Sequence, residues 1–212
     1  MRGLRLLSVA ILLLPASVLA GAQAEAPLSA SVQASLQRAV SDRAAPRLAF
    51  ASEADARSWL GAMSRRLERQ MPDDMLRLDF LKTVHYEATR AGLDPELVLA
   101  LVQVESAFRK YALSTVGARG FMQVMPFWVT AIGSDEHNLF HLRTNLRYGC
   151  TILRHYLDIE QGNLFRALGR YNGSLGQAEY PNLVLRAWSS WRVPSARTVE
   201  FRPAGGPSPF RP

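Results

Sequence analysis

The segment from Asp94 to Glu105 constrains the fold more than any other part of the chain. Asp94 is a good N-cap residue, Pro95 suits the first helical position, and Glu96 suits the positive end of the helix dipole. Residues 97–102 that follow are all apolar. An uninterrupted apolar run of this kind predicts a helix that is buried on most of its circumference.

Helical signals extend over most of residues 53–192. Ser52 is a plausible N-cap with an aspartate three residues later, and it predicts a helix that starts after it. A second helical pattern follows Pro72, and Gly92 fits the position just after its end. Shorter helical patterns cover about 121–132, 144–161 and 164–171. Because strand signals are sparse and no repeat is present, we expect an all-α fold, or α with minor β, in a single globular domain.

The N-terminus has the features of a secretory signal peptide. Arg2 and Arg5 precede a nearly unbroken apolar run over 6–14, which predicts a signal peptide over 1–24. Cleavage sites of the Ala-x-Ala type end at Ala20 and at Ala24. The alternative is an uncleaved membrane anchor, but the run is short for a bilayer span. We therefore expect a periplasmic protein, secreted across the inner membrane, with no stable membrane insertion after signal removal.

Two further segments flank the predicted domain, and the charge of the chain is spread along it. We expect residues 25–52, rich in alanine and serine, to form a leader or loosely docked arm. The Pro- and Gly-rich segment 193–212 is expected to be a disordered tail. The chain carries a net charge of +7, and removal of the signal peptide leaves 23 basic and 18 acidic residues. Basic residues in no single run suit a polyanionic environment but do not indicate nucleic-acid binding.

Glu105 is the first candidate for chemistry. Val98, Leu101, Val102 and Glu105 stand at positions i, i+3, i+4 and i+7, so one helix face carries three apolar residues and then a carboxylate. Partial desolvation raises the pKa of a carboxyl group toward the value that a general acid needs near neutral pH. A solvated carboxylate at a helix end would give the same pattern. The stripe alone makes Glu105 a candidate acid.

Residues that suit a sugar ligand follow Glu105 in the chain. Gln123 and Asn172 carry amides, which offer the donors and the acceptor that hydroxyl and acetamido groups require. Gly117 and Gly120 would let the backbone approach a ligand closely. A helix-end carboxylate, a glycine-containing loop and a later Tyr-Asn pair therefore predict the walls of a groove for a hydrogen-bonding ligand.

Three short motifs in this order resemble the soluble lytic transglycosylase family, whose catalytic domain is lysozyme-like (Slt-type). The motifs are Glu105-Ser106, Gly120-Phe121-Met122-Gln123 and Tyr171-Asn172, and the resemblance covers about 80–192. Asn145 and Gly149 also resemble a helix start and a close-packed glycine of that family. The chain departs from the family at Phe121, where leucine is usual, at Arg170, where alanine is usual, and at Gly173-Ser174. We expect these departures to alter the wall of the cleft.

The resemblance implies cleavage of the β-1,4 bond between N-acetylmuramic acid and N-acetylglucosamine in peptidoglycan glycan strands, without a cofactor. Glu105 would act as the acid and then as the base, leaving 1,6-anhydro ends. Ser106 and Gln123 would contact acetamido and sugar groups, Tyr171 would orient Glu105 through its hydroxyl, Asn172 would bind substrate, and Met122 would line the cleft. Substrate-assisted chemistry of this kind needs one protein carboxylate.

Two other functions remain open at this stage. A lysozyme-type hydrolase on the same scaffold differs only in that water, and not the substrate hydroxyl, attacks. A non-catalytic peptidoglycan-binding component of an envelope or secretion assembly has no need of the acid, so the complete set of motifs argues against it. Protein partners are not indicated by the sequence.

The remaining candidates predict structural roles. His137 and His141 stand four apart but lack an evident third ligand, so we expect no metal site. Cys150 has no cysteine partner and no adjacent base, which favours a small buried packing residue. The four tryptophans are expected in the core, with at most one stacked on a glycan. They are Trp59, Trp128, Trp188 and Trp191.

Overall fold

The computed structural model describes residues 23, 25–41 and 48–192, and helices joined by turns and loops make up this part of the chain. Its helices are α1 (Ala30–Ser41), α2 (Glu53–Leu67), α3 (Asp74–Arg90), α4 (Pro95–Ser106), α5 (Phe127–Ile132), α6 (Leu142–Ile159), α7 (Leu164–Asn172) and α8 (Glu179–Trp191).

The described residues contain isolated β-bridges and no strand. The expected all-α, single-domain fold is confirmed. The predicted tail at 193–212 and the signal peptide, apart from Gln23, lie outside the described residues.

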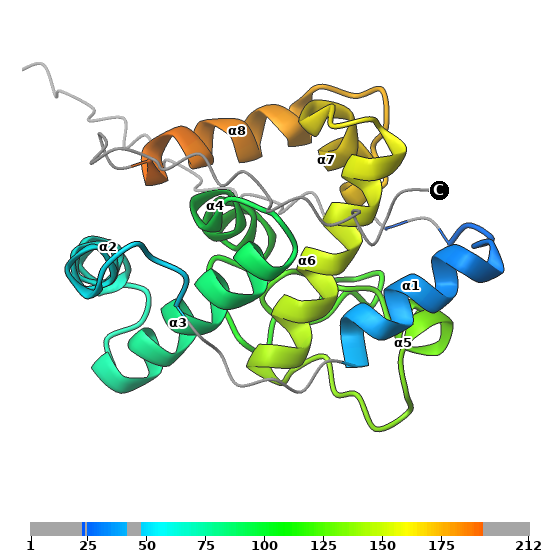
Figure 1. Cartoon of the computed structure of the whole chain (residues 1–212). Coiled ribbons are helices and arrows are strands. Elements are labelled where there is room, and N and C mark those ends of the chain that lie inside the picture. Colours follow the sequence, from blue (N-terminus) through cyan, green and yellow to red (C-terminus); the bar gives the residue numbers. More distant parts are fainter. Residues whose placement is uncertain (1–22, 24, 42–47, 193–212) are drawn as a thin grey trace, which may run out of the picture.

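Helix α4 is the buried helix that the sequence predicts. Its residues 97–102 are all buried, and it packs against α8 on one side and α3 on another (Figure 1). The Asp94 carboxylate caps the helix by accepting hydrogen bonds from the backbone N–H groups of Glu96 and Leu97 at 2.7 and 3.2 Å. Asp94 thus fixes the start of α4, and the apolar run that follows makes α4 the centre of the core.

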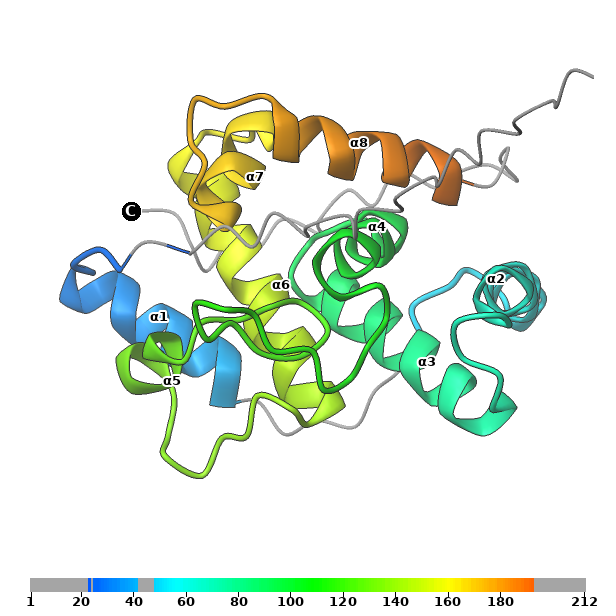
Figure 2. The ribbon, with the colours of Figure 1, turned by 180° about the vertical axis from the view of Figure 1, so that it is seen from behind.

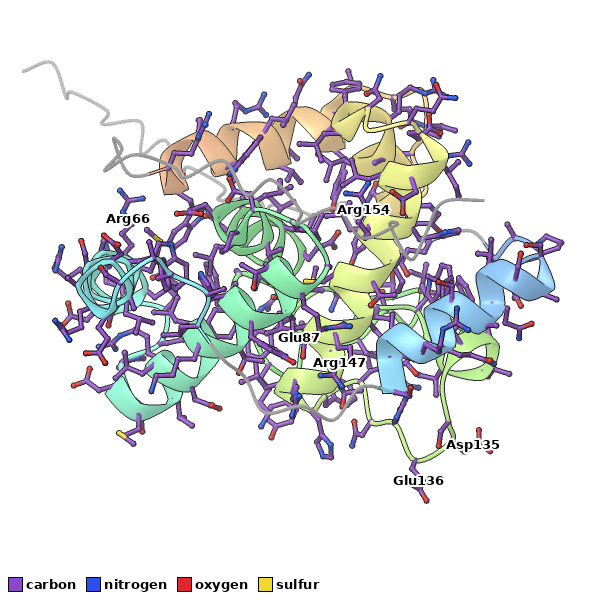
Figure 3. All side chains as sticks on the ribbon, viewed as in Figure 1. Arg66, Glu87, Asp135, Glu136, Arg147 and Arg154 are labelled. Atoms are coloured by element: carbon purple, nitrogen blue, oxygen red, sulfur yellow. The ribbon has the colours of Figure 1, made fainter. Side chains whose placement is uncertain are left out.

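Helix α6 is the second long core helix, and a buried ion pair joins it to α3. Glu87 of α3 is fully buried, and it accepts a hydrogen bond of 2.8 Å from the Arg147 guanidinium of α6 (Figure 3). Arg90 contacts the same carboxylate at 2.9 Å. A buried carboxylate is tolerated only with charged or hydrogen-bonding partners, so this cluster fixes how α3 sits on α6.

The segment 25–52 does not have the loose docking expected from its composition. It contains α1, which packs against α5 and α6 (Figure 1). Leu36 is 0% exposed, Val40 is buried beside it, and the Gln33 amide donates to the Ala131 carbonyl at 2.8 Å. The apolar positions of α1 form a narrow stripe, and the alanines and serines around it hide that stripe from a reading of composition.

Two other sequence expectations differ from the structure. The helix expected over about 121–132 begins only at Phe127, because Gln123 has a positive φ of 48° and cannot be part of a right-handed helix. Helix α8 was not expected at all. Among the described residues, no helix combines the length and apolarity needed to cross a membrane.

The docking of α1 predicts that this helix contributes to the stability of the domain. Leu36→Ala removes a fully buried side chain and should lower the free energy of unfolding by about 2–5 kcal/mol. Gln37→Ala, at the exposed neighbouring position, is the matched control and should change it by less than about 0.5 kcal/mol. Denaturant unfolding measures both. An equal, small effect of the two substitutions would show that α1 is not part of the folded core.

Candidate active site

Glu105 lies at the end of α4, where the chain turns sharply away. Glu105 is buried, with only 7% of its surface exposed. Ala107 and Phe108 follow α4 with positive φ values of 49° and 63°. Left-handed backbone at two consecutive residues other than glycine is costly, and strained segments of this kind cluster at functional sites. The Phe108 ring holds the turn in place, since it packs edge-on against Phe80 and Trp191 with centroids at 6.0 and 5.7 Å.

Burial sets the protonation state of Glu105. Desolvation raises the pKa of this carboxyl to about 8, and a hydrogen bond from Tyr180 opposes the rise. Among the described residues, no charged neighbour contributes to the shift. Glu105 is therefore largely protonated at neutral pH, as a general acid must be. The desolvation expected from the apolar stripe is confirmed.

The residue that holds Glu105 is Tyr180, which the sequence analysis did not single out. The Tyr180 hydroxyl donates a hydrogen bond to Oε1 of Glu105, and both groups are buried. Burial first, and then the Glu105 charge, raise the pKa of Tyr180 well above its ordinary value, so the phenol keeps the proton that it donates. Tyr180 lies in the first turn of α8, and α8 packs against α4 (Figure 2).

Tyr171 does not orient Glu105 through its hydroxyl, and that prediction was wrong. The Tyr171 hydroxyl donates to the backbone carbonyl of Met122 at 2.7 Å. Tyr171 is fully buried on α7, and burial raises the pKa of its phenol well above its ordinary value. Tyr171 therefore ties α7 to the loop that precedes α5, while the neighbouring helix α8 supplies the phenol for the acid.

The loop between α4 and α5 is held by Asn145 of α6. The Asn145 amide donates to the carbonyls of Arg119 and Leu139, both at 2.8 Å, and accepts from the backbone N–H of Met122 at 2.8 Å. A Cβ on Gly120 would lie 2.5 Å from this amide nitrogen. Gly120 therefore serves close approach to Asn145, where the sequence analysis expected close approach to a ligand.

Met122 anchors the same loop in the core. Its side chain is fully buried, so the expected role in lining the cleft is not what the structure shows. A Cβ on Gly149 of α6 would lie 2.3 Å from the Met122 sulfur, which confirms Gly149 as a close-packed glycine. Met122 thus fixes the loop to α6 in two ways. Its side chain packs against Gly149, and its backbone N–H donates to Asn145.

Gln123 follows Met122 in the left-handed conformation. Its amide nitrogen donates to the carbonyls of Gly120 and Ala112 at 2.9 and 3.2 Å, and the residue is nearly buried. These bonds fix the orientation of the Gln123 side chain. The amide oxygen is then the group that would accept a hydrogen bond from a ligand. A fixed amide at a strained backbone position fits the predicted role in binding, which stays a prediction.

Ser106 and Asn172 are both buried. The Ser106 hydroxyl donates to the Val102 carbonyl of its own helix at 3.1 Å, so a sugar contact would use its lone pairs. Asn172 is the last residue of α7, and Gly173 after it adopts the left-handed conformation that ends the helix. Substrate contacts by these two residues stay predictions.

Gln23 is a second residue near the site that the sequence analysis missed. It is 4% exposed, accepts a hydrogen bond from the Met125 backbone N–H at 3.3 Å, and its side chain also contacts the Tyr171 phenol. No local sequence pattern marks Gln23, since it stands in the segment read as a signal peptide. Its burial shows that the chain before α1 supports the loop before α5.

The departures from the family pattern have structural explanations. Arg170 is ion-paired with Glu160 at the end of α6. Phe121 is buried and packs against Phe80 with ring centroids 4.9 Å apart. Glycine at 173 provides the positive φ of 78° that ends α7.

The other candidates have mainly structural surroundings. The His137 ring nitrogen is hydrogen-bonded to the Tyr148 hydroxyl at 2.7 Å, and no group of three or more possible metal ligands gathers among the described residues. Cys150 is fully buried, and burial raises the pKa of its thiol, which confirms a packing residue. Trp128 and Trp191 lie in the core, and the remaining two tryptophans are partly buried against it.

The part of the chain that contains the candidate active site is similar to known proteins. Residues 82–182 match the family model described as a transglycosylase SLT domain. The chain is 34% identical over 103 residues to the transglycosylase of Enterobacteria phage PRD1, covering 49% of this chain and 38% of that protein. It is 47% identical over 47 residues to the membrane-bound lytic murein transglycosylase C of Actinobacillus pleuropneumoniae serotype 5b, covering 22% of this chain and 13% of that protein. In both cases the chain spans less than half of the relative's length.

The two tyrosines predict different effects on the acid. Because the hydrogen bond from Tyr180 lowers the pKa of Glu105, Tyr180→Phe should raise that pKa above about 8. Tyr171→Phe is the matched control, since its hydroxyl bonds to Met122, and it should leave the pKa in place. A pH titration of the Glu105 carboxyl carbon by NMR measures both. A shift in Tyr171→Phe and none in Tyr180→Phe would contradict the assignment.

Proposed function

The chain belongs to the SLT transglycosylase family through residues 82–182, and on this premise we propose that it is a peptidoglycan lytic transglycosylase. It would cleave the β-1,4 bond between N-acetylmuramic acid and N-acetylglucosamine and leave 1,6-anhydro ends. The observation that carries the proposal is the buried, protonated carboxyl of Glu105, held by Tyr180. The matched segment contains both residues.

In the first step Glu105 gives its proton to the oxygen of the glycosidic bond. The bond between that oxygen and C1 of the muramoyl sugar breaks, and the leaving sugar departs with a new hydroxyl. Positive charge develops at C1, where the acetamido oxygen of the same sugar can stabilise it. The rise in pKa to about 8 supplies a carboxyl that carries this proton at neutral pH.

In the second step the Glu105 carboxylate takes the proton from the C6 hydroxyl of the muramoyl sugar. The C6 oxygen then bonds to C1 and closes the 1,6-anhydro ring, so Glu105 ends the cycle protonated. A carboxylate whose conjugate acid has a pKa near 8 is a stronger base than an ordinary one. The same burial therefore serves both steps.

The surrounding residues would position the acid and the sugar. Tyr180 stabilises the carboxylate form between the two steps by donating to Oε1. Gln123, fixed by its bonds to two backbone carbonyls, would accept a hydrogen bond from the sugar next to the cleaved bond. One protein carboxylate is sufficient, in agreement with the lack of a charged neighbour at Glu105 in the described part of the chain.

The product tests this function most simply. Purified peptidoglycan is digested with the wild type and with Glu105→Gln, and the fragments are analysed by mass spectrometry. We expect 1,6-anhydro ends from the wild type and a loss of roughly a thousandfold or more in Glu105→Gln. Reducing ends would instead indicate a lysozyme-type hydrolase. Equal product from the variant would exclude Glu105 as the acid, and no product from the wild type would favour a non-catalytic binding component.

We further propose that the protein acts outside the cytoplasm after removal of its signal peptide, and that removal occurs after Ala20. Cleavage after Ala24 would delete Gln23, whose side chain contacts the Met125 backbone and Tyr171. Cleavage after Ala20 keeps Gln23 in the mature protein.

The mass of the exported protein tests this proposal. An intact mass and an N-terminal sequence that begin at Gly21 are the expected result. Gln23→Ala, expressed with the same start, should be less stable than the wild type, since the hydrogen bond from the Met125 backbone N–H is lost. A mature protein that begins at Glu25 and is fully active would contradict the proposed cleavage site.

A further inference from the structure

Two adjoining cavities lie between α1 and α6, away from Glu105. The smaller, of about 220 Å³, is lined by Arg38, Arg90 and Arg154 among others. The larger, of about 820 Å³, is lined by Arg38, Arg143 and Arg147, and by Glu136 on the loop before α6. Arg38 of α1 belongs to both, so they form one continuous feature. We call it the basic groove, defined by Arg38, Arg90, Arg143, Arg147, Arg154 and Glu136.

The basic groove and the candidate active site use different faces of α6. Asn145 and Gly149 contact the loop at Gly120 and Met122, beside the active site. The groove residues of α6 are three or four apart and so form a separate stripe along the same helix. These residues are Arg143, Arg147, Thr151 and Arg154. A ligand in the groove would therefore lie on the far side of α6 from the acid.

The groove carries more positive charge than its own carboxylates neutralise. Arg90, Arg143 and Arg147 share the single carboxylate of Glu87, at 2.9, 3.5 and 2.8 Å. Arg38 is exposed at the junction of the two cavities and forms no ion pair within the described residues. Arg154 is paired with Asp158 at 2.5 Å. The five arginines of the groove still outnumber the carboxylates of Glu87, Asp158 and Glu136, so positive charge is in excess and the groove attracts anions.

One guanidinium group also has an unused donor. Nη2 of Arg90 is buried and has no hydrogen-bond partner in the part of the chain that the structure describes. Arg90 lines the smaller cavity, where Arg38 and Arg154 also lie. A buried donor without a partner is costly. Guanidinium groups match the planar, two-oxygen geometry of a carboxylate.

The two ends of the groove differ in charge. Arg154 lies near the end of α6 and Arg147 lies closer to its start, while Glu136 lies on the loop that precedes the helix (Figure 3). The lining of the larger cavity also includes Gln37 and Tyr148. Glu136 would repel a polyphosphate, but it can accept hydrogen bonds from an amine or a peptide N–H. This polarity favours a ligand with carboxylates at one end and amines at the other.

We propose that the basic groove binds an acidic peptide that also carries an amine, of the kind attached to the glycan strands of peptidoglycan. The source of the peptide rests on the proposed function, whereas the chemistry of the site does not. A volume of several hundred cubic ångströms suits a ligand of a few residues. The enzyme would hold peptide-bearing glycan through α6 at a site separate from the bond that it cleaves.

Calorimetric titration of the mature protein tests the site directly. The probe is the free tripeptide Ala-γ-Glu-diaminopimelate, which carries carboxylates and amines. Arg38→Ala removes the guanidinium shared by both cavities and should weaken binding by about tenfold or more. The control is Arg57→Ala, an exposed arginine of α2, which lies on the opposite side of the molecule from α1 (Figure 1) and should bind as the wild type does.

Three outcomes would overturn the proposal. They are no binding of the tripeptide at millimolar concentration, equal affinity in Arg38→Ala and Arg57→Ala, and binding of inorganic phosphate in place of the tripeptide. The last outcome would identify a phosphate site instead of a peptide site.

A second measurement separates this proposal from the proposed function. Cleavage is compared on peptide-bearing glycan and on glycan stripped of its peptides. Arg38→Ala should lower kcat/KM on the first substrate and leave it unchanged on the second, while equal losses on both would contradict a peptide site. If the wild type cleaves neither substrate, the proposed function fails, and the titration, repeated in Glu105→Gln, still decides the groove.

Discussion

The burial of one carboxyl group at the end of α4 is the constraint on which the rest of the site depends. Ionised carboxylates are poorly tolerated in an apolar environment, so burial keeps Glu105 protonated and raises its pKa to about 8. That environment is made by α4 itself and by α8, which packs against it and supplies the Tyr180 hydroxyl. A less apolar α4 would leave an ordinary acid that is ionised at neutral pH.

Helix α6 fixes the geometry of the site by holding the loop that carries Gln123. Asn145 and Gly149 hold the loop of Gly120 to Gln123 by amide hydrogen bonds and by close packing. The buried cluster of Glu87 and Arg147 in turn fixes α6 against α3. The left-handed backbone at Gln123 persists because these contacts hold its loop, and the left-handed turn after α4 persists because the Phe108 ring packs against Phe80 and Trp191. The opposite stripe of α6 carries arginines, so the helix that supports the acid also forms a wall of the basic groove.

The sequence predicted the local features of the fold better than its long-range contacts. Asp94, Pro95 and the apolar run after them lie within nine residues of the chain, and they identified α4 and the desolvated face of Glu105. The partner of Glu105 depends on which tyrosine reaches it in space, and the eight residues between Tyr171 and Tyr180 carry no information on that choice. A helical stripe of Tyr180, Val184 and Trp191 was present in the sequence and would have revealed α8. Helix α1 was missed because its stripe is narrow, and Gln23 because its contacts are about 100 residues away in the chain.

The central claim is that a single buried carboxyl, protonated at neutral pH, starts the cleavage of the glycan. The dependence of kcat/KM on pH tests it most directly, because this ratio reports the ionisation of groups in the free enzyme. Since the protonated form of Glu105 is required, activity should be retained below its pKa and fall as the pH rises through about 8. A profile that falls with a midpoint near 4.5, the ordinary value for a glutamic acid, would contradict the account.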